Sequence, residues 1–389
     1  MNSKKIILPV IVFSQFCCTS LWFVGNAIIN DLIRSFNLES SALGNLTSAI
    51  QFGFILGTFI FAILTISDRF SPSKVFFVSA VIASIFNILI AFGSQSLFSL
   101  ITFRFLTGFF LAGIYPVGMK IASDYYEKGL GKSLGFLVGA LVLGTAFPHL
   151  LKGFQGVVIW QYMLYVTSGL AILGGVLILF LVPDGPYKKT LQKFDISIFY
   201  NVFKIKKFKS AAFGYFGHMW ELYTFWAFVP ILLKSYAKFH SNIDFNIPLL
   251  SFFIIAIGSL GCVVSGYLSE VYTPKKVAKI ALSLSCLCCL ISPLFFMLNF
   301  GSIFIIFLMF WGVVVIADSP LFSTLVAKNV DGESKGTALT IVNSIGFSLT
   351  IVSILLVNYL QSIVTAQYLF LILAIGPIFG VYSLYKEKS

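Results

Sequence analysis

Five ionisable side chains lie inside long apolar runs of the sequence. They are two acids, one arginine and two histidines: Glu221, Asp318, Arg104, His149 and His218. A charged group at the centre of a membrane helix costs about 2.5–3.5 kcal/mol, so it normally faces a partner or an interior cavity. Carboxyl and imidazole groups gain and lose protons, and a set of this kind therefore indicates proton chemistry inside a membrane.

The spacing of His218, Glu221 and Asp318 makes these three the strongest candidates for proton chemistry. His218 and Glu221 are three residues apart, and therefore on one face of a helix. Asp318 lies two residues before Pro320, which removes a backbone hydrogen bond and favours a bend. An apolar cavity disfavours the charged form of a carboxyl group, and a nearby arginine favours it. We predict that Asp318 and Glu221 couple protons, with His218 as a relay and Arg104 approaching from the other half of the chain.

Structural roles are open for the same residues. Arg104 can tie helices together or extend its guanidinium group to the outer surface. His218 can form an ordinary interhelical hydrogen bond, as polar side chains in membranes often do. Glu221 can be a permanent partner of His218.

Two further prolines are predicted to break their helices, Pro116 and, beside His149, Pro148. Broken turns beside ionisable side chains create a polar pocket at mid-depth in a membrane. The other candidates for that pocket are polar or aromatic residues in apolar runs: Trp22, Asn26, Gln51, Tyr115 and Asn343.

The composition requires a bilayer as solvent. Of the 389 residues, 58% are apolar, 17% aromatic and 10% charged, whereas a soluble protein has about 25% charged residues. The net charge is +12, but the basic residues are spread between apolar runs, which excludes a nucleic-acid face. The six cysteines lie in apolar runs without metal-ligand spacing, so we expect no metal and no cofactor.

A membrane-spanning helix needs about 20 apolar residues. Twelve segments satisfy this requirement: 6–29, 41–66, 75–94, 97–122, 133–151, 160–182, 210–234, 248–269, 277–298, 301–325, 336–360 and 367–385. The apolar run of the first exceeds that of a cleaved signal peptide. We predict an all-α membrane protein with two six-helix bundles, 1–183 and 210–389, joined by a basic linker, 184–209, with a surface helix around 196–203.

The basic residues predict the orientation. Of the 26 lysines and arginines, four fall in the loops on one side of the membrane: Arg34, Lys152, Lys234 and Lys238. Arg104 lies within a span, and the others fall on the opposite side. The positive-inside rule therefore predicts that both termini are cytoplasmic, in the cell (inner or plasma) membrane.

Two loops about 200 residues apart repeat one another. The first carries Asp68, Phe70, Pro72 and Lys74, and the second carries Glu270, Tyr272, Pro274 and Lys276 at the same spacing. A second pair, Gly113-Ile-Tyr-Pro116 and Ala317-Asp-Ser-Pro320, repeats at nearly the same offset. Such a repeat indicates that the chain contains two copies of one six-helix unit, an arrangement typical of transporters.

The repeated loop resembles that of the major facilitator superfamily, whose pattern between helices 2 and 3 is G-x-x-x-D-R-x-G-x-x-R/K. The chain keeps Asp68, Arg69 and Lys74 but has Leu64 and Ser71 in place of the glycines. The second copy keeps Gly266, Glu270 and Lys276 and has Val271 in place of the arginine. The resemblance implies that both loops take part in gating. It further implies that Asp68 lies near the start of helix 11, around Gly336, where a helix N-terminus favours a carboxylate.

The resemblance covers essentially the whole chain and implies a monomer in which two bundles rock about a central pocket, without ATP. The implied partners are a small-molecule substrate, protons and the lipid bilayer. We predict proton-coupled transport of a small organic solute. The alternative is multidrug efflux by drug–proton antiport, although Ala140 and Leu143 depart from the antiporter pattern of helix 5. An enzyme is not expected, because the sequence offers no nucleophile–base set.

Overall fold

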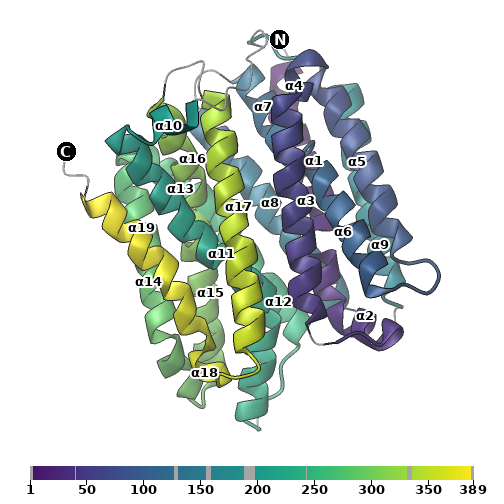
Figure 1. Ribbon diagram of the computed structural model, residues 1–389, viewed down its shortest axis with the longest axis vertical. Helices are drawn as coiled ribbons and strands as arrows, with labels where there is room; N and C mark the ends of the chain where they lie inside the picture. The colour runs from purple at the N-terminus through teal and green to yellow at the C-terminus, as the bar shows by residue number, and fades with distance from the viewer. Residues whose placement is uncertain are drawn as a thin grey trace. The chain divides into compact units, whose positions relative to one another are not determined.

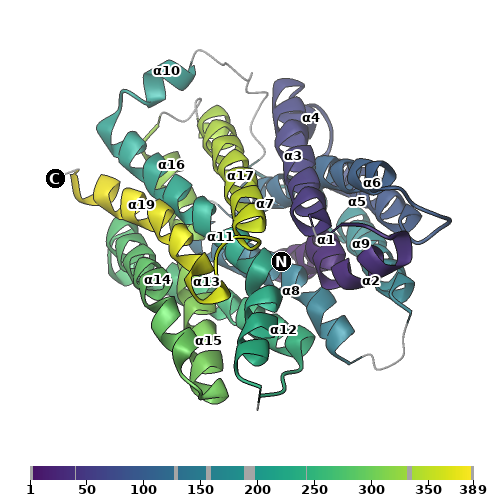
Figure 2. The same ribbon diagram turned by 60° about the horizontal axis from the view of Figure 1, so that its bottom comes forward.

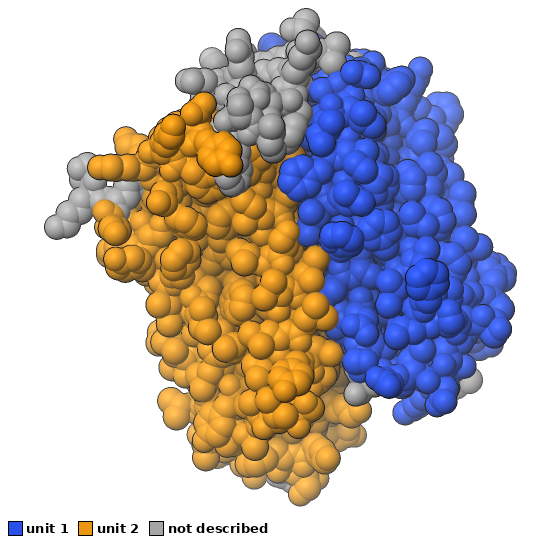
Figure 3. Space-filling model, in the orientation of Figure 1, with its two compact units in different colours: residues 1–194 blue, residues 195–389 orange. Residues whose placement is uncertain are grey.

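The computed structural model describes residues 3–39, 41–126, 130–154, 159–187, 198–241, 243–330 and 335–386. These residues form helices and short connections, and none of them lies in a β-strand (Figure 1). Helices suit a membrane because each satisfies its own backbone hydrogen bonds. The chain divides into unit 1, residues 1–194, and unit 2, residues 195–389 (Figure 3).

The helices of unit 1 are α1 (Ser3–Ala27), α2 (Ile29–Phe36), α3 (Ala42–Ile63), α4 (Ile66–Arg69), α5 (Pro72–Leu89), α6 (Leu97–Leu111), α7 (Tyr115–Tyr125), α8 (Leu130–Gly153) and α9 (Gln161–Leu181). Within unit 1, α3 packs along α6, and α1 packs against both α8 and α9 (Figure 2).

The helices of unit 2 are α10 (Ile198–Val202), α11 (Lys206–Phe239), α12 (Ile247–Ala256), α13 (Gly258–Val271), α14 (Pro274–Met297), α15 (Gly301–Ala317), α16 (Ser319–Lys328), α17 (Lys335–Leu360), α18 (Ala366–Leu369), the 3₁₀ helix η2 (Phe370–Ala374) and α19 (Ile375–Lys386). Within unit 2, α11 packs against α17 and α19, while α13 and α14 pack against α15.

Eleven segments of the described chain are long and apolar enough to cross a membrane. Helix α11 is not among them, although it has 34 residues and matches the seventh predicted span. Its central part, residues 210–233, has no lysine but carries His218 and Glu221, whose polarity lowers the mean hydropathy there. We therefore propose α11 as the twelfth span.

The internal repeat is visible as equivalent helix starts. Pro72 and Pro274 each stand in the first turn of a helix, α5 and α14. Pro116 and Pro320 each stand in the first turn after a break, between α6 and α7 and between α15 and α16. Proline suits this position because its missing N–H has no partner in a first turn. The predicted breaks at Pro116 and Pro320 are confirmed.

The break predicted at Pro148 is wrong. Pro148 lies inside α8, which continues without interruption to Gly153. Helix α1 packs closely against α8 at Gly144, where an added Cβ atom would overlap Thr19 and Phe16. Membrane helices tolerate an internal proline when a neighbouring helix supports them, and α1 provides that support here.

Glycines set how closely the helices of unit 1 approach. A Cβ atom on Gly53 of α3 would overlap the carbonyl oxygen of Phe105 on α6, and one on Gly108 would overlap that of Ile50. Small residues at such crossings let two membrane helices pack backbone against backbone. The α3–α6 pair therefore depends on these two glycines.

Candidate functional site: the buried ionisable groups

Asp318 lies at the break between α15 and α16. It ends α15, and its carbonyl oxygen accepts hydrogen bonds from the backbone N–H groups of Leu321 and Phe322. The Ile316 carbonyl also accepts a hydrogen bond from the Cys262 thiol, at 3.7 Å. Pro320 thus interrupts the helix as predicted, and nearby donors satisfy the backbone there. The Asp318 side chain is buried at this interrupted turn.

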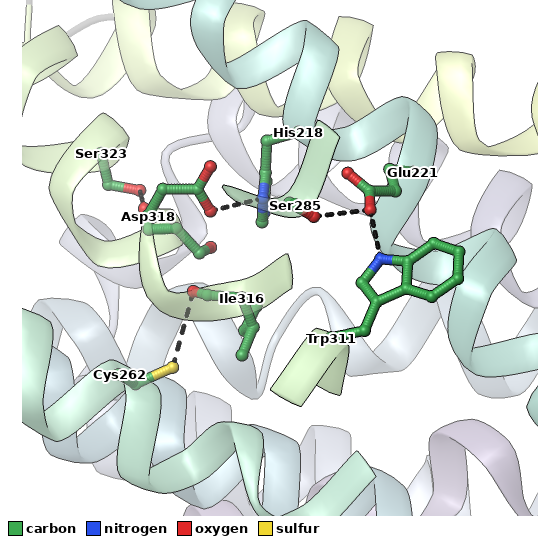
Figure 4. A network of polar contacts seen from close by, with 9 residues as sticks. His218, Glu221, Cys262, Ser285, Trp311, Ile316, Asp318 and Ser323 are labelled. Carbon is green, nitrogen blue, oxygen red and sulfur yellow. Dashed lines mark hydrogen bonds and ion pairs between the residues drawn. The ribbon is translucent and has the colours of Figure 1, made fainter. Parts of the chain in front are cut away.

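His218 of α11 pairs with Asp318. Its Nδ1 atom is 2.7 Å from Asp318 Oδ1, and both side chains are at most 1% exposed (Figure 4). The centre of the imidazole ring is 5.9 Å from the centre of the Tyr215 ring and 6.2 Å from the centre of the Phe322 ring. None of the four polar side-chain atoms of His218 and Asp318 has a well-aligned hydrogen-bond partner among the described residues, so the contact between them is an ion pair by distance. At this distance each group stabilises an opposite charge on the other, so the protonation of the two side chains is coupled.

Glu221 occupies a separate set of contacts one turn further along α11. Its Oε1 atom accepts hydrogen bonds from Ser285 Oγ at 2.5 Å, Trp311 Nε1 at 2.6 Å and Cys289 Sγ at 3.3 Å (Figure 4). Ser285 and Cys289 are one turn apart on α14, and Trp311 comes from α15. The three donors hold the Glu221 carboxyl group at the junction of three helices.

The predicted alternative that Glu221 is the permanent partner of His218 is wrong. Both residues face the interior of unit 2, as their spacing indicated, but their contacts differ. His218 contacts Asp318, whereas Glu221 contacts α14 and Trp311. The sequence did not identify Ser285, Cys289 or Trp311, because nothing in the spacing within one helix reveals which side chain of another helix lies opposite.

Arg104 of α6 lies against α1 in unit 1. It is 1% exposed and donates hydrogen bonds to the backbone carbonyls of Leu21, at 3.0 Å, and Trp22. A Cβ atom on Gly25 would come within 3.1 Å of the guanidinium group, so the glycine makes room for the arginine. Among the described residues no carboxylate forms an ion pair with Arg104. These contacts correspond to the tie between helices that the sequence left open.

The pocket candidates of unit 1 form part of its interior. Asn26 donates a hydrogen bond to Thr47 at 2.9 Å, and Trp22 packs against Phe54 with ring centres 4.8 Å apart. Gln51 is completely buried, and neither its amide nitrogen nor its amide oxygen has a hydrogen-bond partner among the described residues. An amide in this state can bind a polar ligand, because leaving it unpaired is costly.

The remaining candidates are His149, Tyr115 and Asn343. His149 is buried in α8, with no described hydrogen-bond partner for Nε2. Tyr115 is half-buried at the start of α7, beside the break before Pro116. Asn343 is half-buried in α17 of unit 2.

The first gating loop carries an ion pair that the sequence did not reveal. Asp68 in α4 pairs with Lys120 of α7 at 2.9 Å, and Lys120 also lies 3.7 Å from Asp124. Arg69 donates a hydrogen bond to Thr65, whose backbone has the left-handed conformation with φ of 50°. Lys74 is exposed. The loop therefore joins α4 to the end of α7 within unit 1.

The second gating loop is more open. Gly266 lies in α13, and an added Cβ atom there would meet nothing within 4 Å. Glu270 and Lys276 are exposed, and the Lys276 ammonium group lies 5.0 Å from the centre of the Tyr272 ring. Among the described residues, no group of three or more His, Cys, Asp or Glu side chains is arranged to hold a metal ion.

Two helical units that repeat one another, with interrupted apolar helices and ionisable side chains at the interruption, define a membrane transporter. The sequence profile of the Major Facilitator Superfamily matches residues 11–354, and the chain belongs to that superfamily. The resemblance seen in the repeated loops is thereby confirmed.

Solved structures share the fold at low sequence identity. The bacterial homologue of the human lysosomal transporter Spinster, in its inward-facing and unoccupied conformation, is 15% identical with a TM-score of 0.70, covering 99% of this chain and 95% of that chain. The proton:xylose symporter XylE, bound to 6-bromo-6-deoxy-D-glucose, is 13% identical with a TM-score of 0.77. The match covers 99% of this chain and 96% of that chain. No curated protein sequence matches this chain.

Proposed function

We propose that the protein is a proton-coupled secondary transporter of a small organic solute, working as a monomer in the cell membrane. The observation that carries the proposal is the buried His218–Asp318 pair at the break between α15 and α16. A net charge is costly inside a membrane, so the pair is expected to gain or lose a proton only when water reaches the site.

The proposed step is the transfer of one proton. With one proton bound, on either His218 or Asp318, the pair has no net charge. When that proton leaves to water, a neutral imidazole and a carboxylate remain, and the pair has a net charge of −1. The 2.7 Å separation of Nδ1 and Oδ1 makes the two groups one ion pair, so a proton on one changes how readily the other holds a proton. Glu221 is proposed as the second proton-binding acid. It lies one turn from His218 on α11, and its carboxyl group is held by three donors.

The solute is proposed to contact Gln51 of unit 1, whose buried amide has two unused hydrogen-bonding atoms. Asn26 and Trp22 lie on the neighbouring helix α1, and Arg104 supports that helix through the Leu21 and Trp22 carbonyls. Arg104 is thus proposed as a support for the solute site. His149, Tyr115 and Asn343 remain candidates without a proposed role.

Uptake into proteoliposomes tests the function. Radiolabelled sugars, amino acids, carboxylates and lipophilic cations are offered one at a time, with and without a pH gradient of either direction. We expect one class of polar solute to accumulate only with a gradient. Accumulation of lipophilic cations alone, against an opposing proton gradient, would favour drug–proton antiport, and gradient-independent equilibration would make the protein a uniporter.

The gate can be tested at Asp68. We propose that its contact with the start of α17, near Gly336, keeps the cytoplasmic side closed, while Lys120 positions the carboxylate at 2.9 Å. Asp68→Asn is expected to slow the maximal transport rate several-fold and to change the apparent solute affinity by only a few-fold. The matched control is Glu39→Gln, which removes an exposed acid of the same unit. Normal turnover in Asp68→Asn would exclude the gate.

Topology tests the proposed twelve spans, α11 included. In a cysteine-free background, an impermeant maleimide is expected to reach Lys193→Cys and Lys275→Cys only from the cytoplasm and Asp244→Cys only from outside. Lys193 lies outside the described residues, whereas Asp244 is exposed in the connection after α11. Labelling of positions 193 and 244 from the same face would show that α11 does not span the membrane.

A further inference from the structure

A lateral groove of about 370 Å³ runs along α11 in unit 2, and every residue that lines it is apolar. Its floor is formed by α11, with Phe213, Gly217 and Trp220. One wall is Ile345 and Leu349 of α17, and the other is α19. Figures 1 and 2 both show α11 passing between α17 and α19.

The groove is open on its outer side. On α19, Ile375 is 54% exposed and Phe379 is 48% exposed. The Trp220 indole donates its N–H to the Ile372 carbonyl at 3.2 Å, which fixes the ring against the groove. In a bilayer such a surface meets hydrocarbon, and a preformed apolar groove of this kind fits a flexible chain.

Cations lie at one end of the groove. Lys206 and Lys209 precede Phe213 by seven and four residues, so they share the face of α11 that forms the floor. Both lysines are exposed, and the Lys209 ammonium group is 5.6 Å from the centre of the Phe213 ring. No ion pair among the described residues uses either lysine. Helix α19 adds Lys386, which is exposed and lies over Tyr382 at 5.8 Å.

The dimensions fit a phospholipid. From Phe213 to Trp220 the groove extends about 10 Å along α11, because a helix rises about 1.5 Å per residue. Lys209 lies one turn beyond that end. A bilayer has a hydrocarbon core about 30 Å thick, so one leaflet occupies about half of this depth. A headgroup at the lysines therefore places its acyl chain in the groove.

We propose that this groove is a binding site for an anionic diacyl phospholipid, with the phosphate on Lys206, Lys209 and Lys386 and one acyl chain between α17 and α19. Clusters of basic residues at the end of a membrane helix attract anionic lipids, and pockets between helices bind their headgroups. We expect a zwitterionic lipid to bind this site more weakly, because its headgroup carries no net charge for the lysines to attract. The site is independent of the proposed proton chemistry.

The test is native mass spectrometry of the full chain in detergent, titrated with dioleoylphosphatidylglycerol and, separately, dioleoylphosphatidylcholine. Each lysine near an anionic surface contributes about fivefold in affinity, so Lys206→Gln with Lys209→Gln is expected to weaken phosphatidylglycerol binding about 25-fold. The matched control replaces Lys234 and Lys238 with glutamine, at the other end of α11, where both are exposed. The control is expected to bind like the unmodified protein.

A second measurement locates the chain. Phosphatidylglycerol with brominated acyl chains is expected to quench a component of tryptophan fluorescence that is absent in Trp220→Phe. Equal affinity for the two lipids, equal losses in the two double variants, or unchanged quenching in Trp220→Phe would each overturn the proposal. Raising the salt concentration is expected to weaken phosphatidylglycerol binding, because exposed charges are screened.

Discussion

An Asp318→Asn variant is expected to lose solute accumulation driven by a pH gradient, down to the level of protein-free liposomes, while counterflow exchange of the solute continues. The amide has nearly the shape of the carboxyl group and carries hydrogen-bonding atoms at the same positions beside His218, but it cannot gain or lose a proton at neutral pH. The protein therefore folds and binds solute, and the gradient no longer drives the cycle. Uptake and counterflow in the same proteoliposomes separate these two results.

The matched control is Asp244→Asn, which makes the same change at an exposed acid. It is expected to accumulate solute normally. If Asp318→Asn lost counterflow together with accumulation, Asp318 would be needed for solute binding or folding, and its assignment to proton coupling would be withdrawn.

A Gly53→Ala variant is expected to lose most of its folded, monodisperse protein. The new Cβ atom would overlap the Phe105 carbonyl oxygen, a backbone atom that cannot move without displacing α6. Overpacking costs about 1–3 kcal/mol even where side chains can adjust, and here the whole helix must shift. The melting temperature and the yield after size-exclusion chromatography provide the measurement.

Gly266→Ala is the matched control for this prediction. It makes the same substitution inside a helix, but its Cβ atom would meet nothing within 4 Å. Alanine is favoured over glycine in a helix by about 0.5–1 kcal/mol, so Gly266→Ala is expected to be as stable as the unmodified protein or more so. Equal melting temperatures for the two variants would show that the α3–α6 crossing tolerates a wider spacing.

The helices were largely predictable because apolar runs of about 20 residues have few other stable states in a membrane. The breaks before Pro116 and Pro320 followed from the chemistry of proline, and with them the position of Asp318 at an interrupted turn. Pro148 shows the limit of that inference. The local rule holds only where no neighbouring helix supports the turn, and the packing of α1 against Gly144 is not visible in one sequence.

The partners of the buried acids were not predictable for a related reason. Periodicity places Glu221 and His218 on one face of α11, but the residues opposite them come from distant helices. Ser285 and Cys289 are four residues apart and therefore on one face of α14. This spacing indicates a polar face, but it does not reveal that Glu221 lies opposite. The ion pair between Lys120 and Asp68 was likewise not predictable, because nothing in the sequence shows that Lys120 of α7 lies beside the first gating loop.

The central claim is that Asp318 and Glu221 together couple solute transport to protons. The most direct measurement is pH-gradient-driven uptake by the double variant Asp318→Asn, Glu221→Gln, compared with the unmodified protein, with counterflow as the control for folding and binding. We predict that counterflow persists and that gradient-driven accumulation is abolished. Accumulation that survives in the double variant would contradict the account and place the coupling site elsewhere in the chain.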